Sequence, residues 1–213
     1  MLLPLGLMSA SWGCAVNPHV QVHRLENGQL QVEGPLAGPF PKLEALLSGT
    51  CELMTQEPGA SNGMYGSEYC ALFYYSPTDK AFFLSYLSDI KSSLDSATKS
   101  CELPRFVHDD THPDSIVLGG AHTHPHNRKF SRRDLGVTAQ WNPTRFADKT
   151  TGQIFDRSLL MFFREPTGEC RAYAYNNFTH IVSALRDDEL VAIGRVTTDS
   201  GDLRMFEGKD WLP

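Results

Sequence analysis

Two pairs of apolar, strand-length segments constrain the fold of this chain more than any other feature. Residues 68–76 (EYCALFYYS) and 81–87 (AFFLSYL) are separated by the four turn residues PTDK, and residues 158–166 (SLLMFFREP) and 169–177 (ECRAYAYNN) flank a Thr-Gly pair. Apolar and aromatic runs of this length, bounded by turn residues, predict strands, and a short turn between two such runs predicts a hairpin. We therefore expect two β-hairpins.

The other segments predict further strands and a few helices. Residues 17–40 contain two alternating stretches around the turn signal ENG, which predicts a small hairpin, and a short helix is expected after Pro41, ending at Gly49. Residues 115–124 (SIVLGGAHTH) predict a buried strand, and residues 131–141 have partly helical spacing. Strands mixed with a few helices predict an α/β or α+β domain, in which helices flank a mixed central β-sheet.

Length and composition indicate a folded domain with an N-terminal extension. The chain has 213 residues, of which 41% are hydrophobic and 21% charged, as in ordinary globular proteins. We expect an extension over residues 17–60 and a main domain over residues 61–213, with an irregular polar insertion at about 88–114. The net charge of -6 argues against a nucleic-acid partner, which usually requires a basic face.

The first sixteen residues, MLLPLGLMSASWGCAV, are apolar and rich in small residues but too short to span a bilayer. They are typical of an export signal, although no Lys or Arg precedes Arg24. We therefore expect an exported protein, anchored to a membrane only if Cys14 is lipidated. An ordinary buried segment is the alternative, and nothing in the sequence indicates an oligomeric state.

The five cysteines support the same expectation. Without Cys14, an even number remains, and Cys51, Cys70, Cys101 and Cys170 permit two disulfides in three connectivities. None belongs to a C-x-x-C pair, so a cysteine-based zinc site is not expected. Scattered buried thiols are the alternative.

The residues that indicate chemistry lie in residues 119–135, GGAHTHPHNRKFSRRDL. His122 and His124 flank Thr123, and alternate side chains of an extended segment point to the same face, so both imidazoles can reach one ion. Asp134 offers a carboxylate oxygen as a third ligand. Two neutral imidazoles and one carboxylate leave a fourth position for water, which is typical of a catalytic Zn²⁺ site.

This pattern resembles the JAB/MPN (JAMM) metalloprotease family, whose motif is His-Ser/Thr-His-Pro, a spacer and Ser-x-x-Asp, with a glutamate far upstream. Residues 122–125 (HTHP) and 131–134 (SRRD) match it, with a spacer of five residues where six is usual. Glu68, which opens the run EYCALFYYS, is the best match for the glutamate. The resemblance covers about residues 61–185 and implies a JAB/MPN-like fold with one catalytic Zn²⁺.

The resemblance also implies hydrolysis of a peptide or isopeptide bond. Zinc lowers the pKa of its bound water toward about 7, and Glu68 would act as the general base that takes the proton and hands it to the leaving amine. Zinc and the Ser131 hydroxyl would stabilise the oxyanion that the substrate carbonyl becomes in the tetrahedral intermediate. The loss of one hydrogen-bond donor to such an oxyanion typically lowers the rate by about 10²–10³. The expected partner is a peptide or protein substrate, whose identity the sequence does not give.

Simpler interpretations apply to several of these residues. Ser131 and Asp134 also have the spacing of a helix N-cap with an acidic third residue, and both roles can hold together. We expect His126 to be a solvated loop residue. His108 and His112 flank two aspartates, which favours a polar loop over a second ligand cluster.

Three other glutamates precede the motif, but Glu52, Glu57 and Glu102 do not open a buried strand as Glu68 does. The main alternative function is a non-catalytic JAB/MPN-like binding or scaffolding module. A zinc deaminase is not expected, because the sequence has neither an H-x-E nor a P-C-x-x-C motif.

Overall fold

The computed structural model describes residues 16–91, 100–136, 142–197 and 201–212. Residues 1–15, which carry the expected export signal and Cys14, lie outside this description. The elements of the described residues are β1 (Val22–Arg24), β2 (Leu30–Glu33), β3 (Ala37–Phe40), α1 (Leu43–Thr55), the 3₁₀ helix η1 (Gly63–Tyr65), β4 (Cys70–Ser76), β5 (Ala81–Leu84), β6 (Phe106–His108), β7 (Ile116–Thr123), α2 (Arg132–Leu135), β8 (Arg145–Ala147), β9 (Ile154–Asp156), β10 (Ser158–Arg164), β11 (Cys170–Asn176), β12 (Ile181–Arg186), β13 (Glu189–Val196) and β14 (Leu203–Met205).

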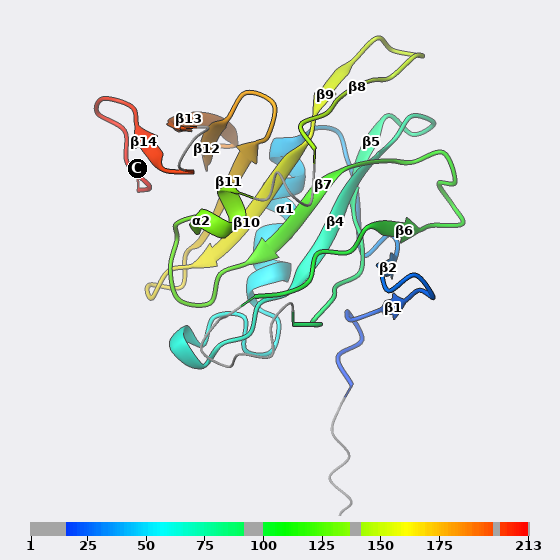
Figure 1. Cartoon of the computed structure of the whole chain (residues 1–213), viewed down its shortest axis with the longest axis horizontal. Coiled ribbons are helices and arrows are strands. Elements are labelled where there is room, and N and C mark those ends of the chain that lie inside the picture. Colours follow the sequence, from blue (N-terminus) through cyan, green and yellow to red (C-terminus); the bar gives the residue numbers. More distant parts are fainter. Residues whose placement is uncertain (1–15, 92–99, 137–141, 198–200, 213) are drawn as a thin grey trace, which may run out of the picture.

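A nine-stranded mixed sheet forms the body of the molecule (Figure 1). Its strand order is β14-β13-β12-β11-β10-β7-β4-β5-β3, and two smaller sheets, β1-β2-β6 and β8-β9, lie beside it. Both predicted hairpins form, since β4 pairs antiparallel with β5 and β10 pairs antiparallel with β11. Strand β7 joins them, antiparallel to β4 and parallel to β10. Strand β7 is therefore an interior strand of the sheet, with a neighbour on each side.

The expectation of an α/β domain with a helix-flanked sheet, as the JAB/MPN resemblance implied, is wrong. The described residues are 41% strand and 11% helix, and their two α helices are α1 and the single turn α2. Residues 137–141, part of the segment with helical spacing, lie outside the described residues. One face of the sheet is covered by aromatic side chains and the C-terminal segment, where flanking helices were expected. The domain is consequently β-rich.

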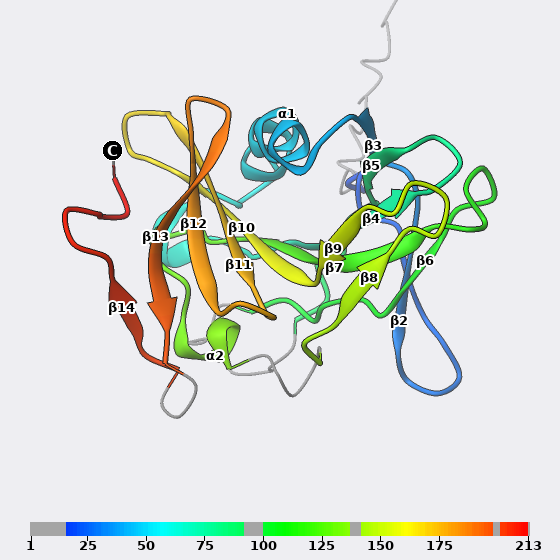
Figure 2. The same cartoon turned by 90° about the horizontal axis from the view of Figure 1, so that it is seen from above.

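Helix α1 covers the other face (Figure 2). It buries Leu46, Leu47 and Met54 against the sheet. The helix was expected to end at Gly49 but continues to Thr55. Gly49 is small for a packing reason, because a Cβ there would lie 2.6 Å from a ring carbon of Phe40.

The N-terminal strands are built into the same body. The predicted hairpin of residues 17–40 forms between β1 and β2, and β2 also pairs in parallel with β6. Strand β3 pairs with β5 and forms one edge of the large sheet. Within the described residues, no helix is long and apolar enough to cross a membrane.

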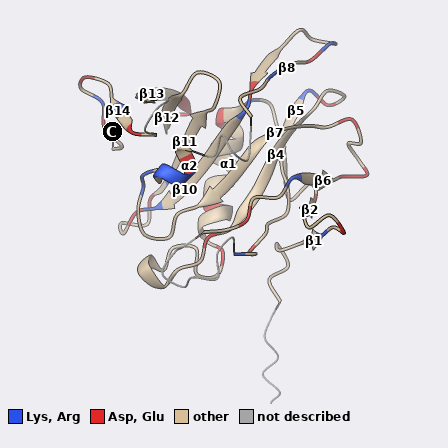
Figure 3. Cartoon of the chain, viewed as in Figure 1, with Lys and Arg blue, Asp and Glu red and all other residues tan. Residues whose placement is uncertain are grey.

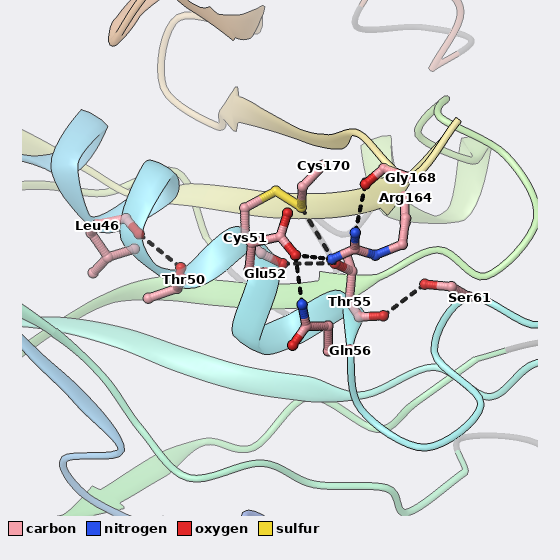
Figure 4. Close-up of a disulfide and its surroundings, with 10 residues drawn as sticks. All are labelled: Leu46, Thr50, Cys51, Glu52, Thr55, Gln56, Ser61, Arg164, Gly168 and Cys170. Carbon is pink, nitrogen blue, oxygen red and sulfur yellow. Dashed lines mark hydrogen bonds and ion pairs between the residues drawn. A yellow bond between two sulfur atoms is a disulfide. The ribbon is translucent and has the colours of Figure 1, made fainter. Parts of the chain in front are cut away.

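The four described cysteines form two disulfides. Cys51–Cys170 ties α1 to β11 (Figure 4), and Cys70–Cys101 ties the start of β4 to the segment before β6. Arg164 lies beside the first bridge and forms an ion pair with Glu52. This pairing selects one of the three connectivities that the sequence left open.

Candidate metal centre

The paired histidines lie at the end of β7. His122 is the ladder partner of Cys70 on one side and of Met161 on the other, and the His124 N–H donates to the Phe162 carbonyl at 2.9 Å. Both side chains are buried, with 4% and 5% exposure. Alternation along the strand places both imidazoles on the same face of the chain, as the spacing predicted.

Thr123, between the two histidines, has a function that the sequence reasoning missed. Its hydroxyl accepts a hydrogen bond from the Tyr69 N–H at 2.9 Å, and its own N–H donates to the Tyr69 carbonyl at 3.0 Å. Thr123 is completely buried. These contacts fix the chain next to Glu68 against the strand that carries the histidines. The alternation of side chains along a strand could have indicated this role, because the middle residue of a His-x-His segment points to the face opposite the two histidines.

The short spacer after the histidines is held by aromatic packing. Phe130 is buried and its ring lies 6.2 Å from the His122 ring, 6.3 Å from Tyr175 and 6.3 Å from Trp211. Arg128 in the same spacer pairs with Glu165 at 2.6 Å. The spacer of five residues is therefore anchored at its middle residue, Arg128, and at its last residue, Phe130, which directly precedes Ser131.

A capping box orients Asp134. The Asp134 N–H donates to the Ser131 hydroxyl at 3.1 Å, and the Ser131 N–H donates to Oδ2 of Asp134 at 2.6 Å. This reciprocal pair satisfies two donors at the start of α2. It also holds the Asp134 carboxylate in one orientation, so the expected cap and a ligand role are compatible.

The three predicted ligands converge. Nε2 of His122 lies 3.0 Å from Nε2 of His124 and 3.6 Å from Oδ1 of Asp134, and Nε2 of His124 lies 3.3 Å from Oδ2 of Asp134. A tetrahedral zinc site with bonds of about 2.0–2.1 Å has ligand-to-ligand distances of about 3.3–3.4 Å. The donor atoms are therefore spaced to hold an ion of this size. Among the described residues, this is the one cluster of His, Cys, Asp and Glu that meets such a geometry.

The charge state of the cluster suits a cation. Burial alone would raise the pKa of Asp134, but the two imidazoles outweigh it and hold this pKa far below its ordinary value. The Nδ1 atoms of His122 and His124 are buried and form no hydrogen bond with the described residues. Packing against Phe130 and against each other therefore orients the rings.

Glu68 lies beside this cluster. It precedes β4 by two residues, is half-buried, and is close enough to His124, Asp134 and Arg133 for their charges to act on its carboxyl. Burial raises the pKa of Glu68 to about 7; Asp134 adds to the rise, whereas His124 and a hydrogen bond from the Cys101 N–H oppose it. A carboxyl with this pKa can exchange a proton near neutral pH.

The other glutamates that precede the motif lie elsewhere. Each has its own partner: Glu52 pairs with Arg164, Glu57 accepts from Asn17 and His19, and Glu102 pairs with Arg24. These three partners distinguish Glu52, Glu57 and Glu102 from Glu68, whose assignment as the glutamate of the motif stays a prediction.

The second histidine-rich segment forms a separate hydrogen-bonded chain. His112 lies between Asp79 and Asp109, at 2.7 Å from each, and Asp109 also accepts from the Tyr74 hydroxyl at 2.6 Å. The Phe83 ring packs against His112 with centroids 4.3 Å apart. These contacts join a loop to the sheet. His126 is exposed and bonds to Asn127, as expected for a loop residue.

The rim of the site is partly apolar and partly basic. The η1 loop packs on Pro125, since the Gly63 N–H donates to the Pro125 carbonyl at 3.0 Å. This loop exposes Met64 (80%) and Tyr65 (94%) to solvent. On another side, α2 carries Arg132 and Arg133 and is coloured as a basic turn in Figure 3.

Comparisons with protein-family models, curated proteins and solved structures found no match. The interpretation of the site therefore depends on its own geometry. Two imidazoles and a carboxylate can hold a zinc-sized cation, and a carboxyl that can accept a proton lies next to them.

Proposed function

We propose that this protein is a zinc-dependent metallopeptidase that hydrolyses peptide or isopeptide bonds. The convergence of His122, His124 and Asp134 is the observation that carries the proposal, because their donor atoms lie 3.0–3.6 Å apart, with both histidines buried and Asp134 half-buried. The likeness of the sequence motif to that of the JAB/MPN metalloproteases supports the same activity.

Three of the residues would hold the metal, and a fourth would transfer the proton. His122, His124 and Asp134 would hold zinc, which when bound supplies a Lewis acid and a water that ionises near neutral pH. Glu68 accepts a proton from the attacking water and donates it to the leaving amine. Its half-buried position and its pKa of about 7 suit both directions of transfer.

Ser131 is placed to stabilise the developing oxyanion. Its oxygen accepts the Asp134 N–H as part of the capping box, which leaves the hydroxyl proton available as a donor. Ser131 is also exposed, so a substrate can reach it. A donor of this kind typically contributes about 10²–10³ in rate.

The surroundings favour a polypeptide substrate. Exposed Met64 and Tyr65 lie on a loop that contacts Pro125, one residue from His124, and offer apolar contact to a substrate side chain. The two disulfides favour an oxidising compartment, in agreement with the expected export.

The test combines metal analysis with peptide hydrolysis. The purified protein should contain one zinc per chain and cleave members of a peptide library, and Glu68→Gln should lower kcat by about 10²–10⁴ while zinc is retained. His124→Ala should abolish zinc binding, whereas His126→Ala, a matched change at an exposed histidine, should not. Full activity after Glu68→Ala or His124→Ala would contradict the proposal. Stoichiometric zinc without turnover would favour the binding-module alternative.

A further inference from the structure

A partly buried ion pair joins the spacer of the metal motif to the turn that follows β10. Nη2 of Arg128 lies 2.6 Å from Oε2 of Glu165, and the guanidinium carbon of Arg128 lies 5.9 Å from the centre of the Phe163 ring. Glu165 is buried, and its Oε1 has no hydrogen-bond partner among the described residues. Because a buried carboxylate is costly without a cationic partner, the charge of Glu165 depends on Arg128.

Glu165 is the better fixed member of this pair. Its N–H donates to the Glu169 carbonyl at 2.8 Å, and its carbonyl accepts from the Gly168 N–H at 2.8 Å, which closes the turn between β10 and β11. Arg164, which precedes Glu165, pairs with Glu52 of α1. The turn is therefore held by its own backbone and by the helix, so the ion pair fastens the spacer to the sheet.

The spacer connects the two parts of the proposed metal centre. It follows Pro125 and ends directly before Ser131, whose capping box orients the Asp134 carboxylate. Strand β10 already holds the histidine end, because the His124 N–H donates to the Phe162 carbonyl at 2.9 Å. The ion pair attaches the middle of the spacer to the residue that follows the same strand. The end of β10 thus supports both ligand segments.

We propose that Arg128 is a positioning residue, which acts through Glu165 to hold the spacer so that Asp134 stays within reach of the two imidazoles. Arg128 is not itself a ligand. The consequence for zinc rests on the proposed metallopeptidase function, whereas the ordering of the spacer does not. Groups that orient metal ligands from outside the ligand set typically contribute about 10–100-fold to metal affinity.

The first test measures zinc affinity by competition with a chelating dye, at a temperature where all variants are folded. Arg128→Met keeps an apolar stem but removes the charge, and it should raise the zinc dissociation constant about tenfold. Arg128→Lys should recover most of the affinity, because the ion pair is made through one nitrogen atom. Equal zinc affinities for wild type and Arg128→Met would overturn the proposal and leave the peptidase assignment intact.

The chain offers a matched control in the β8–β9 hairpin. Arg145 pairs with Asp156 at 2.6 Å, and its guanidinium carbon lies 4.1 Å from the centre of the Phe178 ring. It therefore makes the same two kinds of contact as Arg128, but it belongs to β8, outside the metal motif. Arg145→Met should keep wild-type zinc affinity. An equal loss of affinity in Arg145→Met and Arg128→Met would contradict a specific role for Arg128.

A second measurement needs neither zinc nor activity. In metal-free protein, the amides of Ser131 and Asp134 form the capping box, and the His124 amide is bonded to the sheet. Amide hydrogen exchange at Ser131 and Asp134 should become about tenfold faster in Arg128→Met, because the loosened spacer lets the box open, while exchange at His124 stays unchanged. If wild type binds no zinc, the peptidase proposal fails, but faster exchange at the capping box still supports the positioning role. Unchanged exchange at both amides would overturn that role, whether or not the protein proves to be a peptidase.

Discussion

At the scale of single residues, the candidate site depends on strand alternation at the end of β7. Two histidines point to one face, and Thr123 points to the other, where its hydroxyl accepts the Tyr69 N–H. This hydrogen bond links the ligand strand to the segment that begins with Glu68. Thr123 therefore fixes the segment of Glu68, the proposed general base, against the strand of the proposed ligands.

Replacement of Thr123 by the isosteric valine tests this role. Thr123→Val leaves the buried Tyr69 N–H without its acceptor, which should lower the free energy of unfolding by about 1–3 kcal/mol. It should also lower kcat, because Glu68 adjoins Tyr69. Thr123→Ser keeps the hydroxyl and should behave more like wild type in urea unfolding and in peptide hydrolysis. Equal unfolding free energies for wild type and Thr123→Val would show that the hydrogen bond contributes nothing.

Glu68 gives a prediction of pH-dependent stability for the metal-free protein. Its folded-state pKa of about 7 exceeds the ordinary value of 4.5, because of burial and the Asp134 charge. The folded state therefore binds more protons, and the associated stability is fully present below about pH 4.5 and is lost as pH rises through 7. Glu68→Gln stays neutral and avoids this loss. At pH 8 it should be more stable than wild type by roughly 2–3 kcal/mol, after allowance for partial exposure.

The measurement is chemical denaturation of chelator-treated protein at pH 4.5 and pH 8. The two proteins should differ little at the lower pH, since Glu68 is then protonated in the folded state and about half protonated in the unfolded state. Glu207→Gln, at an exposed position, is the control and should show no pH-dependent gain. A wild type that is as stable as Glu68→Gln at pH 8 would contradict a raised pKa for Glu68.

At the scale of secondary-structure elements, local patterns predicted the two hairpins but misplaced the end of α1. The turn residues between apolar runs identified the β4–β5 and β10–β11 hairpins, because hairpin pairing is a local property. The helix expected over residues 131–141 is described only at its start, as the single turn α2, and residues 137–141 lie outside the described residues. Gly49 was interpreted as a stop signal, although tertiary contact with Phe40 is what requires a small residue there. Local sequence does not reveal such distant contacts.

The aromatic cluster around Phe130 makes a prediction about the spacer. Trp211 is buried, and its ring packs on Phe130 and Tyr173. Its backbone carbonyl accepts a hydrogen bond of 2.9 Å from the Tyr173 hydroxyl. Trp211→Ala should cost about 3–5 kcal/mol of unfolding free energy. It should also weaken zinc binding, because the spacer that delivers Asp134 loses the support behind Phe130.

A control variant at Phe155, on the opposite face of the sheet, separates the loss of stability from the loss of zinc affinity. Phe155 is equally buried and packs on Tyr75 and Phe82 in the cluster that includes α1. Phe155→Ala should cost a similar amount of stability but leave zinc affinity unchanged in a competition titration with a chelating dye. If both variants keep wild-type zinc affinity, the C-terminal segment does not support the metal site.

At the scale of the whole molecule, the site forms where distant segments meet in one sheet. The motif identified His122, His124 and Asp134 because they are near in sequence and their spacing determines their faces. The contribution of Cys101 to the Glu68 environment was not predictable, since the sequence left three disulfide connectivities open. Local spacing therefore predicted which three side chains converge, and long-range topology determined what surrounds them.

The same topology links metal binding to global stability. The three proposed ligands are His122 at the end of β7, His124 just beyond it and Asp134 in α2. Because the folded sheet brings them together, the unfolded chain cannot reproduce their arrangement. A ligand that binds only the folded state stabilises it by about 2.7 kcal/mol when its free concentration is a hundred times its dissociation constant. Zinc should therefore raise the unfolding midpoint, and a chelator should reverse the effect.

The comparison of variants assigns that stabilisation to the proposed site. Asp134→Asn removes the anionic ligand and should lose most of the zinc-dependent shift, whereas His126→Ala, an exposed neighbour outside the cluster, should keep it. Magnesium should stabilise little, because it prefers six oxygen ligands over imidazole nitrogens. An equal zinc-dependent shift in Asp134→Asn and wild type would place the stabilising ion elsewhere, since an ion held by both imidazoles and this carboxylate cannot lose a ligand without losing affinity.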